Sequence, residues 1–336
     1  MHRKNIILDT DIGPDCDDVA ALAVLNLLAD RGLCRILGVS HCTSNPYGAG
    51  MIDVINRYYG RPDIAISTYG GKGFLTDETC MRYNRYIATH YPNRYQACQP
   101  EEAVGMYRRI LAAQEDKSVE VIGIGPMNNL SDLLDSKPDG YSMLSGISLV
   151  ERKVSKLTMM AGAFRCSSKE AVERAERMRK KRIEDMAEYN VECDIPAARN
   201  VAARWPTPKA YLGFEAGLIL TGGRLYRCVP GTHPVRVAYE LHGSSEGRFS
   251  WDPLTVEYAV VEGCPHFRES VRGTVRFDEK GRTRWKVDEN GWDCFVELAQ
   301  EDERVVADMD TLLTSSPSGL GQAFATGGDA TGVRCV

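Results

Sequence analysis

The chain has 336 residues, 43% of them hydrophobic and 26% charged, which suits one large α/β domain or two smaller ones. Its net charge of −5 comes without a field of Lys and Arg that could hold phosphates, so nucleic acid is excluded as an expected partner. No apolar run reaches about 18 residues, and we therefore expect no transmembrane helix and no membrane partner.

Apolar runs of strand length alternate with helical patterns along the first half of the chain. The expected strands are 5–9, 34–41, 64–67, 118–123 and 157–161, and the expected helices are 17–31, 47–60, 101–114 and 127–134. Such alternation is typical of βαβ units. We predict an α/β fold with a mostly parallel open sheet and helices on both faces.

The rest of the chain gives weaker signals. Residues 168–186 are dense in charge and predict a solvated surface helix, with a basic gate over an anionic substrate as the alternative. Alternating apolar residues over 268–288 predict a β-hairpin. Because the chain is rich in Gly, Ser and Thr from Ser315, we expect one domain over residues 1–312 and a flexible tail over 313–336.

Cysteine usage and the N-terminus bear on location. The eleven cysteines are scattered without CxxC spacing, which predicts free thiols in a reducing compartment. Residues 1–5 lead into a strand-length apolar run rather than a signal-peptide core. We therefore expect a cytoplasmic protein.

The most informative segment is an acidic loop after the first strand, Asp9-Thr10-Asp11-Ile12-Gly13-Pro14-Asp15-Cys16-Asp17-Asp18. Five carboxylates this close repel one another unless a hard cation such as Ca²⁺ or Mg²⁺ neutralises them. A helical run follows at once, so the loop lies at a strand–turn–helix corner, where α/β proteins commonly build their sites. Alone, Asp17 and Asp18 could equally be helix N-caps.

Two enzyme classes open with such a loop. An apolar strand followed by Asp-x-Asp is also found in metal-dependent phosphatases of the haloacid dehalogenase type, in which Asp9 would be the nucleophile. Those enzymes usually carry Thr or Val where this chain has Gly13, and they place their second acidic pair far downstream. The alternative is a cation site built within one loop.

The loop resembles the entry motif of nucleoside hydrolases, extended here by the two residues Asp15 and Cys16. Five further segments resemble motifs of the same family in the same order: 38–45 ending in Asn45, Gly125-Pro126-Met127-Asn128-Asn129-Leu130, Met159-Met160-Ala161-Gly162, Ala187-Glu188-Tyr189-Asn190-Val191, and Ser250-Trp251-Asp252-Pro253-Leu254. The resemblance covers residues 5–260. It implies a Rossmann-like fold and calcium-dependent hydrolysis of the N-glycosidic bond of a ribonucleoside.

The resemblance also implies roles for individual residues. The calcium ligands would be Asp11, Asp18, Asp252 and the backbone carbonyl of Asn128, and Asp11 would also be the general base for the attacking water. The ribose hydroxyls would be held by the side chains of Asp17, Asn45, Glu188 and Asn190. Asp9 is expected to support the loop, and the role of Asp15 stays open. Family members are commonly dimers or tetramers, so a homo-oligomer and a small nucleoside substrate are the expected partners.

Two positions depart from the family pattern. Trp251 occupies the place of a His that can protonate the leaving base, and it resembles purine-preferring members that stack an aromatic ring on the base; its alternative role is core packing. Arg182 replaces an Asn expected near the 5′ end of the sugar and could accept a phosphate. Because no leaving-group acid is visible, a ribose- or nucleoside-binding protein without turnover is the main alternative.

Overall fold

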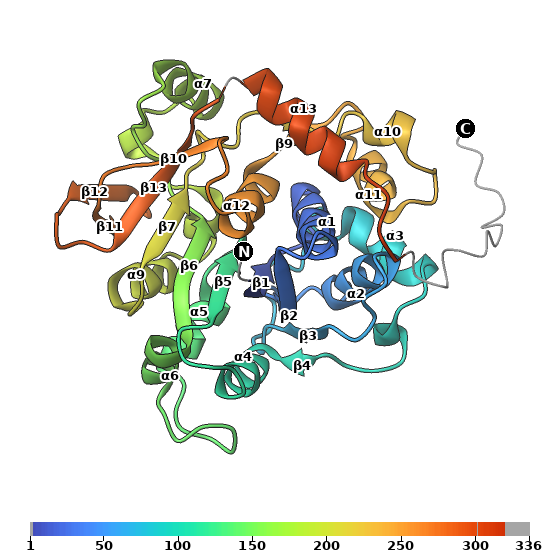
Figure 1. Ribbon diagram of the computed structural model, residues 1–336, viewed down its shortest axis with the longest axis horizontal. Coiled ribbons are helices and arrows are strands. Elements are labelled where there is room, and N and C mark those ends of the chain that lie inside the picture. Colours follow the sequence, from blue (N-terminus) through green and yellow to red (C-terminus); the bar gives the residue numbers. More distant parts are fainter. Residues whose placement is uncertain (1–2, 301, 320–336) are drawn as a thin grey trace.

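The computed structural model describes residues 3–300 and 302–319, and it is built around one eleven-stranded sheet (Figure 1). The strand order is β12-β11-β13-β7-β6-β5-β1-β2-β3-β4, with β10 beside β13. The strands are β1 (Lys4–Thr10), β2 (Cys34–His41), β3 (Ala65–Thr68), β4 (Glu101–Glu102), β5 (Val119–Gly123), β6 (Val154–Met160), β7 (Lys209–Leu212), β10 (Phe267–Glu269), β11 (Gly273–Phe277), β12 (Thr283–Val287) and β13 (Asp293–Leu298).

The strands from β4 through β1 to β7 and β13 are parallel, whereas β10 and β11 pair antiparallel with β13, and β12 pairs antiparallel with β11. The chain builds outward from β1 through β2, β3 and β4, and then returns to β5 on the other side of β1. In open α/β sheets, such a reversal of strand order leaves a crevice at the carboxyl ends of the two strands. The predicted mostly parallel sheet is confirmed.

Helices cover both faces of the sheet, as predicted (Figure 1). One face is covered by α1 (Asp17–Asp30), α2 (Gly48–Tyr58), α3 (Arg82–His90), α11 (Pro234–His242), α12 (Trp251–Val260) and α13 (Asp302–Leu313). The other face is covered by α4 (Ala103–Ala112), α5 (Asn128–Asp135), α6 (Gly146–Lys153) and α9 (Ile195–Arg204). Because side chains alternate along a strand, Ile6 and Leu8 pack in the first core and Ile7 packs in the second.

The remaining elements are short. Two are the helices α8 (Tyr189–Cys193) and α10 (Leu225–Cys228), and the strands β8 (Leu220–Thr221) and β9 (Arg248–Phe249) pair in a separate two-stranded sheet. Three turns of 3₁₀ helix span Glu78–Met81, Arg94–Gln96 and Ile183–Asp185. The hairpin predicted within 268–288 is confirmed as β11 and β12. The charged segment forms α7 (Lys169–Arg179), shorter than expected because Lys180 takes a left-handed conformation with φ of 52° and ends the helix.

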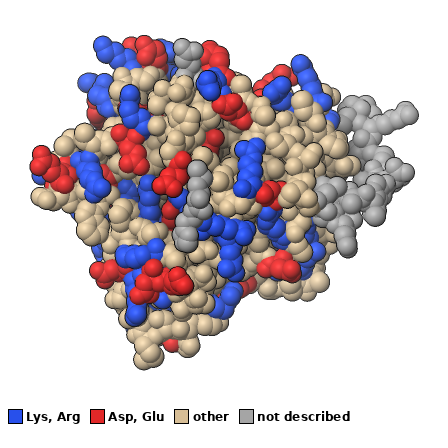
Figure 2. Space-filling view, in the orientation of Figure 1, with Lys and Arg blue, Asp and Glu red and all other residues tan. Residues whose placement is uncertain are grey.

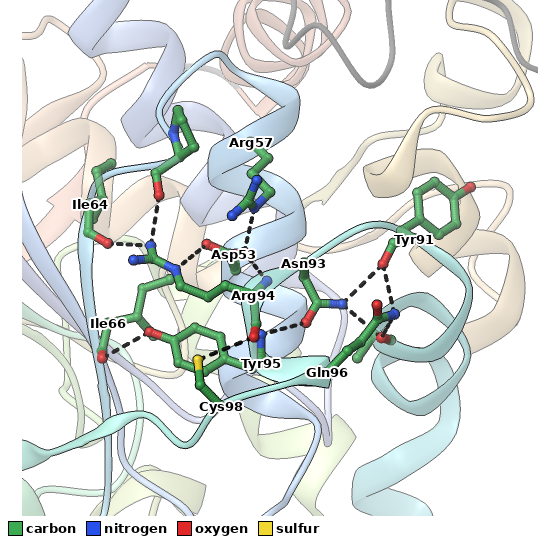
Figure 3. Close-up of polar contacts among 12 residues, drawn as sticks. Asp53, Arg57, Ile64, Ile66, Tyr91, Asn93, Arg94, Tyr95, Gln96 and Cys98 are labelled. Atoms are coloured by element: carbon green, nitrogen blue, oxygen red, sulfur yellow. Dashed lines mark hydrogen bonds and ion pairs between the residues drawn. The ribbon is translucent and has the colours of Figure 1, made fainter.

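The long connection between α3 and α4 is anchored to the sheet by a buried carboxylate (Figure 3). Asp53 of α2 accepts hydrogen bonds from Arg57 Nε at 2.5 Å and from Arg94 Nε at 2.8 Å. Arg94 Nη2 also donates to the Ile64 carbonyl oxygen at 2.7 Å, next to β3. The connection is therefore tied to both α2 and the edge of the sheet.

The molecular surface mixes both charges. On the face drawn in Figure 2, basic and acidic side chains are interspersed with uncharged ones. Within residues 3–300 and 302–319, no helix is long and apolar enough to cross a membrane. The predicted tail falls largely on residues 320–336, which lie outside the described residues; before them, the Ser318 N–H donates to Asp30 Oδ2 at 2.8 Å.

Candidate active site

The acidic loop leaves β1 at the point where the strand order reverses, and it meets the turn that follows β5. Gly125 in that turn lies so close that a Cβ there would be 2.8 Å from the Asp11 backbone nitrogen and 2.6 Å from Cys42 Sγ. Only glycine fits such an approach without displacing backbone. The turn carrying Asn128 is thereby held against Asp11.

Asp9 points away from the loop, into the face covered by α4 and α5, because it follows Ile7 at the spacing of two residues. Its Oδ2 accepts hydrogen bonds from the Tyr107 hydroxyl at 2.9 Å and from Asn129 Nδ2 at 3.0 Å. Burial raises the pKa of Asp9 to about 6, against the effect of these bonds. These contacts agree with a supporting role.

Three carboxylates from two distant segments converge beside the loop. Asp17 and Asp18 are the first two residues of α1 and Asp252 is the second residue of α12, and one carboxylate oxygen from each lies within 4.8 Å of the others. Asp18 Oδ1 accepts from Thr10 Oγ1 at 2.5 Å, and Asp17 Oδ2 accepts from the Asp252 backbone N–H at 3.2 Å. We call Asp11, Asp17, Asp18 and Asp252 the carboxylate cluster.

Burial has the largest effect on the pKa values of the carboxylate cluster. It raises the pKa of Asp11 to about 7, with the charges of Asp15, Glu188 and Asp9 adding to the shift. Burial followed by neighbouring carboxylates also raises the pKa values of Asp17, Asp18 and Asp252 well above the usual range. The site therefore favours any arrangement that brings positive charge to these oxygens.

The donor atoms around the cluster fit a hard cation. They are carboxylate oxygens, joined by the amide of Asn128, whose Nδ2 donates to the Cys42 carbonyl at 2.9 Å. Asn128 Oδ1 is buried and has no hydrogen-bond partner among the described residues. An all-oxygen set of this kind suits Ca²⁺ or Mg²⁺ better than softer metals.

Of the four residues expected to hold ribose, Asp17 belongs to the cluster, and the other three are buried and engaged in local hydrogen bonds. Asn45 Nδ2 donates to the Cys80 carbonyl at 2.6 Å. Glu188 caps α8 by accepting from the Asn190 backbone N–H at 2.9 Å, and burial raises its pKa to about 7. Asn190 Nδ2 donates to the Met160 carbonyl at 3.0 Å. Asn45 thus lies after β2, whereas Glu188 and Asn190 both bond to the backbone at or just beyond the end of β6.

Trp251 is packed more tightly than the sequence suggested. Its Nε1 donates to the Phe214 carbonyl at 2.8 Å, and its ring stacks on the Phe214 ring at 5.5 Å between centroids. The Phe249 ring lies 5.4 Å away at a tilt, and 9% of the residue is exposed. The aromatic contacts expected of a base-stacking residue are thus made by this chain's own rings.

Sequence reasoning missed Arg248, which forms an ion pair with Asp15 at 2.5 Å. Arg248 precedes Asp252 by four residues, and that proximity to an expected ligand was the one signal that could have drawn notice. Tyr107 and Asn129, the partners of Asp9, were also missed. Arg182 lies outside the cluster's bonding network: 77% of its side chain is exposed, and Glu184 is 3.9 Å away.

The carboxylate cluster lies beyond the carboxyl end of β1, where the strand order reverses, and open α/β proteins bind their ligands at such positions. The family model described as inosine-uridine preferring nucleoside hydrolase matches residues 6–310. The chain therefore belongs to this family of N-glycosyl hydrolases, and the resemblance inferred from the sequence is confirmed.

Solved structures share the fold at low identity. A purine-preferring ribonucleoside hydrolase from Gardnerella vaginalis is 17% identical with a TM-score of 0.66, covering 95% of this chain and 99% of that one. An inosine-uridine preferring nucleoside hydrolase from Bacillus anthracis is 16% identical with a TM-score of 0.63, covering 93% and 99%. The type III effector protein XopQ, solved with adenosine diphosphate ribose, is 17% identical with a TM-score of 0.65, covering 94% of each chain. No curated protein matches this sequence.

Proposed function

We propose that this protein is a calcium-dependent N-ribohydrolase that cleaves ribonucleosides into ribose and free base. The observation that carries the proposal is the carboxylate cluster: buried acids from the starts of α1 and α12 meet within 4.8 Å at the reversal of the sheet. Cleavage of an N-glycosidic bond builds positive charge on the sugar, and carboxylates around that position stabilise it. Family membership supports the reaction class.

In the proposed site, Asp11, Asp18, Asp252 and the Asn128 carbonyl hold Ca²⁺. A bound calcium ion supplies charge that acidifies a water and anchors the ribose diol. Asp11 accepts the proton of the attacking water, as a carboxylate within hydrogen-bond reach of that water can do. Asp17, Asn45, Glu188 and Asn190 bind ribose hydroxyls, so that binding energy orients the anomeric carbon.

A purine preference is the finer part of the proposal. It rests on Trp251, which stands where other members carry a proton-donating His. Stacking of a base on the Trp251 ring would need Phe214, Phe249 or Arg248 to shift, since all three contact the ring. The comparison of purine and pyrimidine nucleosides described below therefore tests the purine preference.

A second candidate function is binding of a nucleoside or related riboside without turnover. It is supported by the same Trp251, which cannot donate a catalytic proton, and by the fold shared with an effector protein solved with adenosine diphosphate ribose. A phosphatase mechanism has less support. It needs Asp9 as nucleophile, and the Asp9 carboxylate is 1% exposed and bonded to Tyr107 and Asn129.

The decisive experiment measures ribose released from purine and pyrimidine nucleosides, with calcium and after chelation. We expect release that the chelator abolishes and added Ca²⁺ restores. Ribose release that persists without metal would contradict the calcium role. Binding of nucleosides by calorimetry, without release of ribose from any member of the panel, would favour the binding protein.

The expected assembly and location stay predictions. A dimer or tetramer follows from family resemblance alone, and a size measurement in solution decides it. Cytoplasmic location follows from cysteine usage, and the ten cysteines among the described residues are free thiols.

A further inference from the structure

The carboxylate of Asp15 is turned out of the cluster and into an ion pair. Arg248 Nε donates to Asp15 Oδ1 at 2.8 Å, and Arg248 Nη2 donates to Asp15 Oδ2 at 2.5 Å. The two side chains are 29% and 26% exposed, so the pair is partly shielded from water. A two-pronged bond of this kind restricts orientation as well as distance.

Other contacts hold the same loop from two helices. The Tyr83 hydroxyl of α3 donates to the Asp15 carbonyl at 2.5 Å. His242, at the end of α11, places Nε2 3.9 Å from Asp15 Oδ1. The two-residue extension, Asp15 and Cys16, therefore lies docked between α3, α11 and β9.

The ion pair joins the two chain segments that carry the cluster. Asp17 follows Asp15 by two residues and begins α1, while Asp252 follows Arg248 by four residues and lies in the first turn of α12. Like charges on Asp17, Asp18 and Asp252 push these two helix starts apart. An opposite-charge bond directly beside them resists that separation.

Aromatic rings fix the guanidinium of Arg248. Its Cζ lies 5.6 Å from the centre of the Trp251 ring and 5.9 Å from that of Phe249. Cations favour such positions over aromatic rings. The orientation of Arg248 is thus set by the residue next to Asp252.

We propose that the Asp15–Arg248 pair positions the metal site, by holding the starts of α1 and α12 at the separation at which their carboxylates share one cation. Both are positioning residues, which act through the cluster. The inference rests on the proposed function, because it assumes that a cation binds there.

The test titrates Ca²⁺ alone into the full chain, after removal of metal, for Asp15→Asn, Arg248→Met and the double variant. We expect each single variant to raise the Kd about tenfold or more, as loss of outer-shell partners commonly does. The double variant is expected to bind no more weakly than the weaker single variant, because both remove the same contact.

If the two residues acted on the bound cation only through their charges, the change in Kd would have the opposite sign for Arg248→Met. Removing the positive charge of Arg248 would then tighten Ca²⁺ binding, while Asp15→Asn would weaken it. Tighter binding by Arg248→Met therefore overturns the positioning role. An unchanged Kd with a lower melting temperature of the metal-free protein also overturns it, because the pair would then be merely structural.

Arg109→Met is a matched control. Arg109 of α4 forms a two-pronged ion pair with Glu101 of β4, with side chains 41% and 33% exposed, and its loss should leave the Kd unchanged. Should Arg248→Met fail to fold, Arg248→Lys keeps the charge without the two-pronged geometry and should still weaken binding. Wild-type protein that binds no Ca²⁺ refutes the proposed function, whereas wild-type binding with unaffected variants refutes this inference alone.

Discussion

Burial away from water is the largest cause of the raised pKa of each carboxylate in the cluster. Two like charges about 4 Å apart repel by about 4 kcal/mol at an effective dielectric constant near 20. Carboxylates that lie within 4.8 Å of one another, as in Asp17, Asp18 and Asp252, therefore resist full ionisation until a cation joins them. Burial raises the pKa of Asp11 to about 7, and a cation bound beside it would lower that pKa again, because positive charge favours the ionised form.

Asp11→Ala tests the proposed base. We expect kcat for nucleoside cleavage to fall by about 10²–10⁴-fold, the usual contribution of a positioned base, with a smaller change in KM. Steady-state ribose release measures both constants. Asp116→Asn, in an exposed ion pair with Arg152, is the control and should behave like wild type. A normal kcat in Asp11→Ala would remove Asp11 from the role of base.

At the scale of elements, helix starts gather at the site. The first turns of α1 and α12 supply Asp17, Asp18 and Asp252 of the carboxylate cluster. Asn128 is the first residue of α5. The positive end of each helix dipole favours negative charge within the first turn. Helix placement thus offsets part of the repulsion that the acidic loop creates.

The cap of α11 makes stability depend on pH. His233 Nδ1 accepts from the Val235 backbone N–H at 3.3 Å, and burial lowers the pKa of His233 to about 4 from the ordinary value near 6.5. The unfolded chain therefore binds the proton first as pH falls from about 6.5 to 4, and the free energy of unfolding drops across that window by up to about 3 kcal/mol.

His233→Asn should remove this dependence while keeping a capping acceptor. Urea unfolding from pH 7.5 to 4.5 is expected to show wild type losing stability relative to the variant. His90→Asn, at an exposed position of α3, is the matched control. Parallel pH profiles for wild type and His233→Asn would refute the assignment.

At the scale of the molecule, the order of the strands places the site. β1 lies between β2 and β5, and the strand order reverses there, which is where open α/β proteins bind their ligands. The cluster beyond these strand ends joins the N-terminal segment to α12. A cation bound there should link distant parts of the fold and stabilise all of it.

Calcium binding should therefore raise the melting temperature. At about 100 times the Kd, binding adds about 2.7 kcal/mol, which corresponds to a shift of about 4 °C for a chain of this size. Scanning calorimetry after chelation, with and without added Ca²⁺ at constant ionic strength, measures it. Asp252→Asn should reduce the shift. An unchanged melting temperature in wild type would argue against a metal site.

Local features were predictable from the sequence. The strand 34–41 was expected at the bounds that β2 has, and helix 17–31 differs from α1 by one residue, because apolar periodicity and turn residues act over a few positions. The acidic loop and the motifs around Asn45, Asn128, Glu188 and Asp252 marked the family for the same reason: each is a short contiguous signal.

The sequence by itself determined the fold class, the family and the carboxylates of the cluster, because each is marked by a short contiguous motif. Tertiary structure alone decided how they meet. Packing brings distant segments together in three places. These are the parallel pairing of β13 with β7, the rings around Trp251, and the bond between Asp15 and Arg248, which are 233 residues apart. The helix and strand propensities of single residues do not predict such contacts, because the contacts form only when the folded chain brings the segments together.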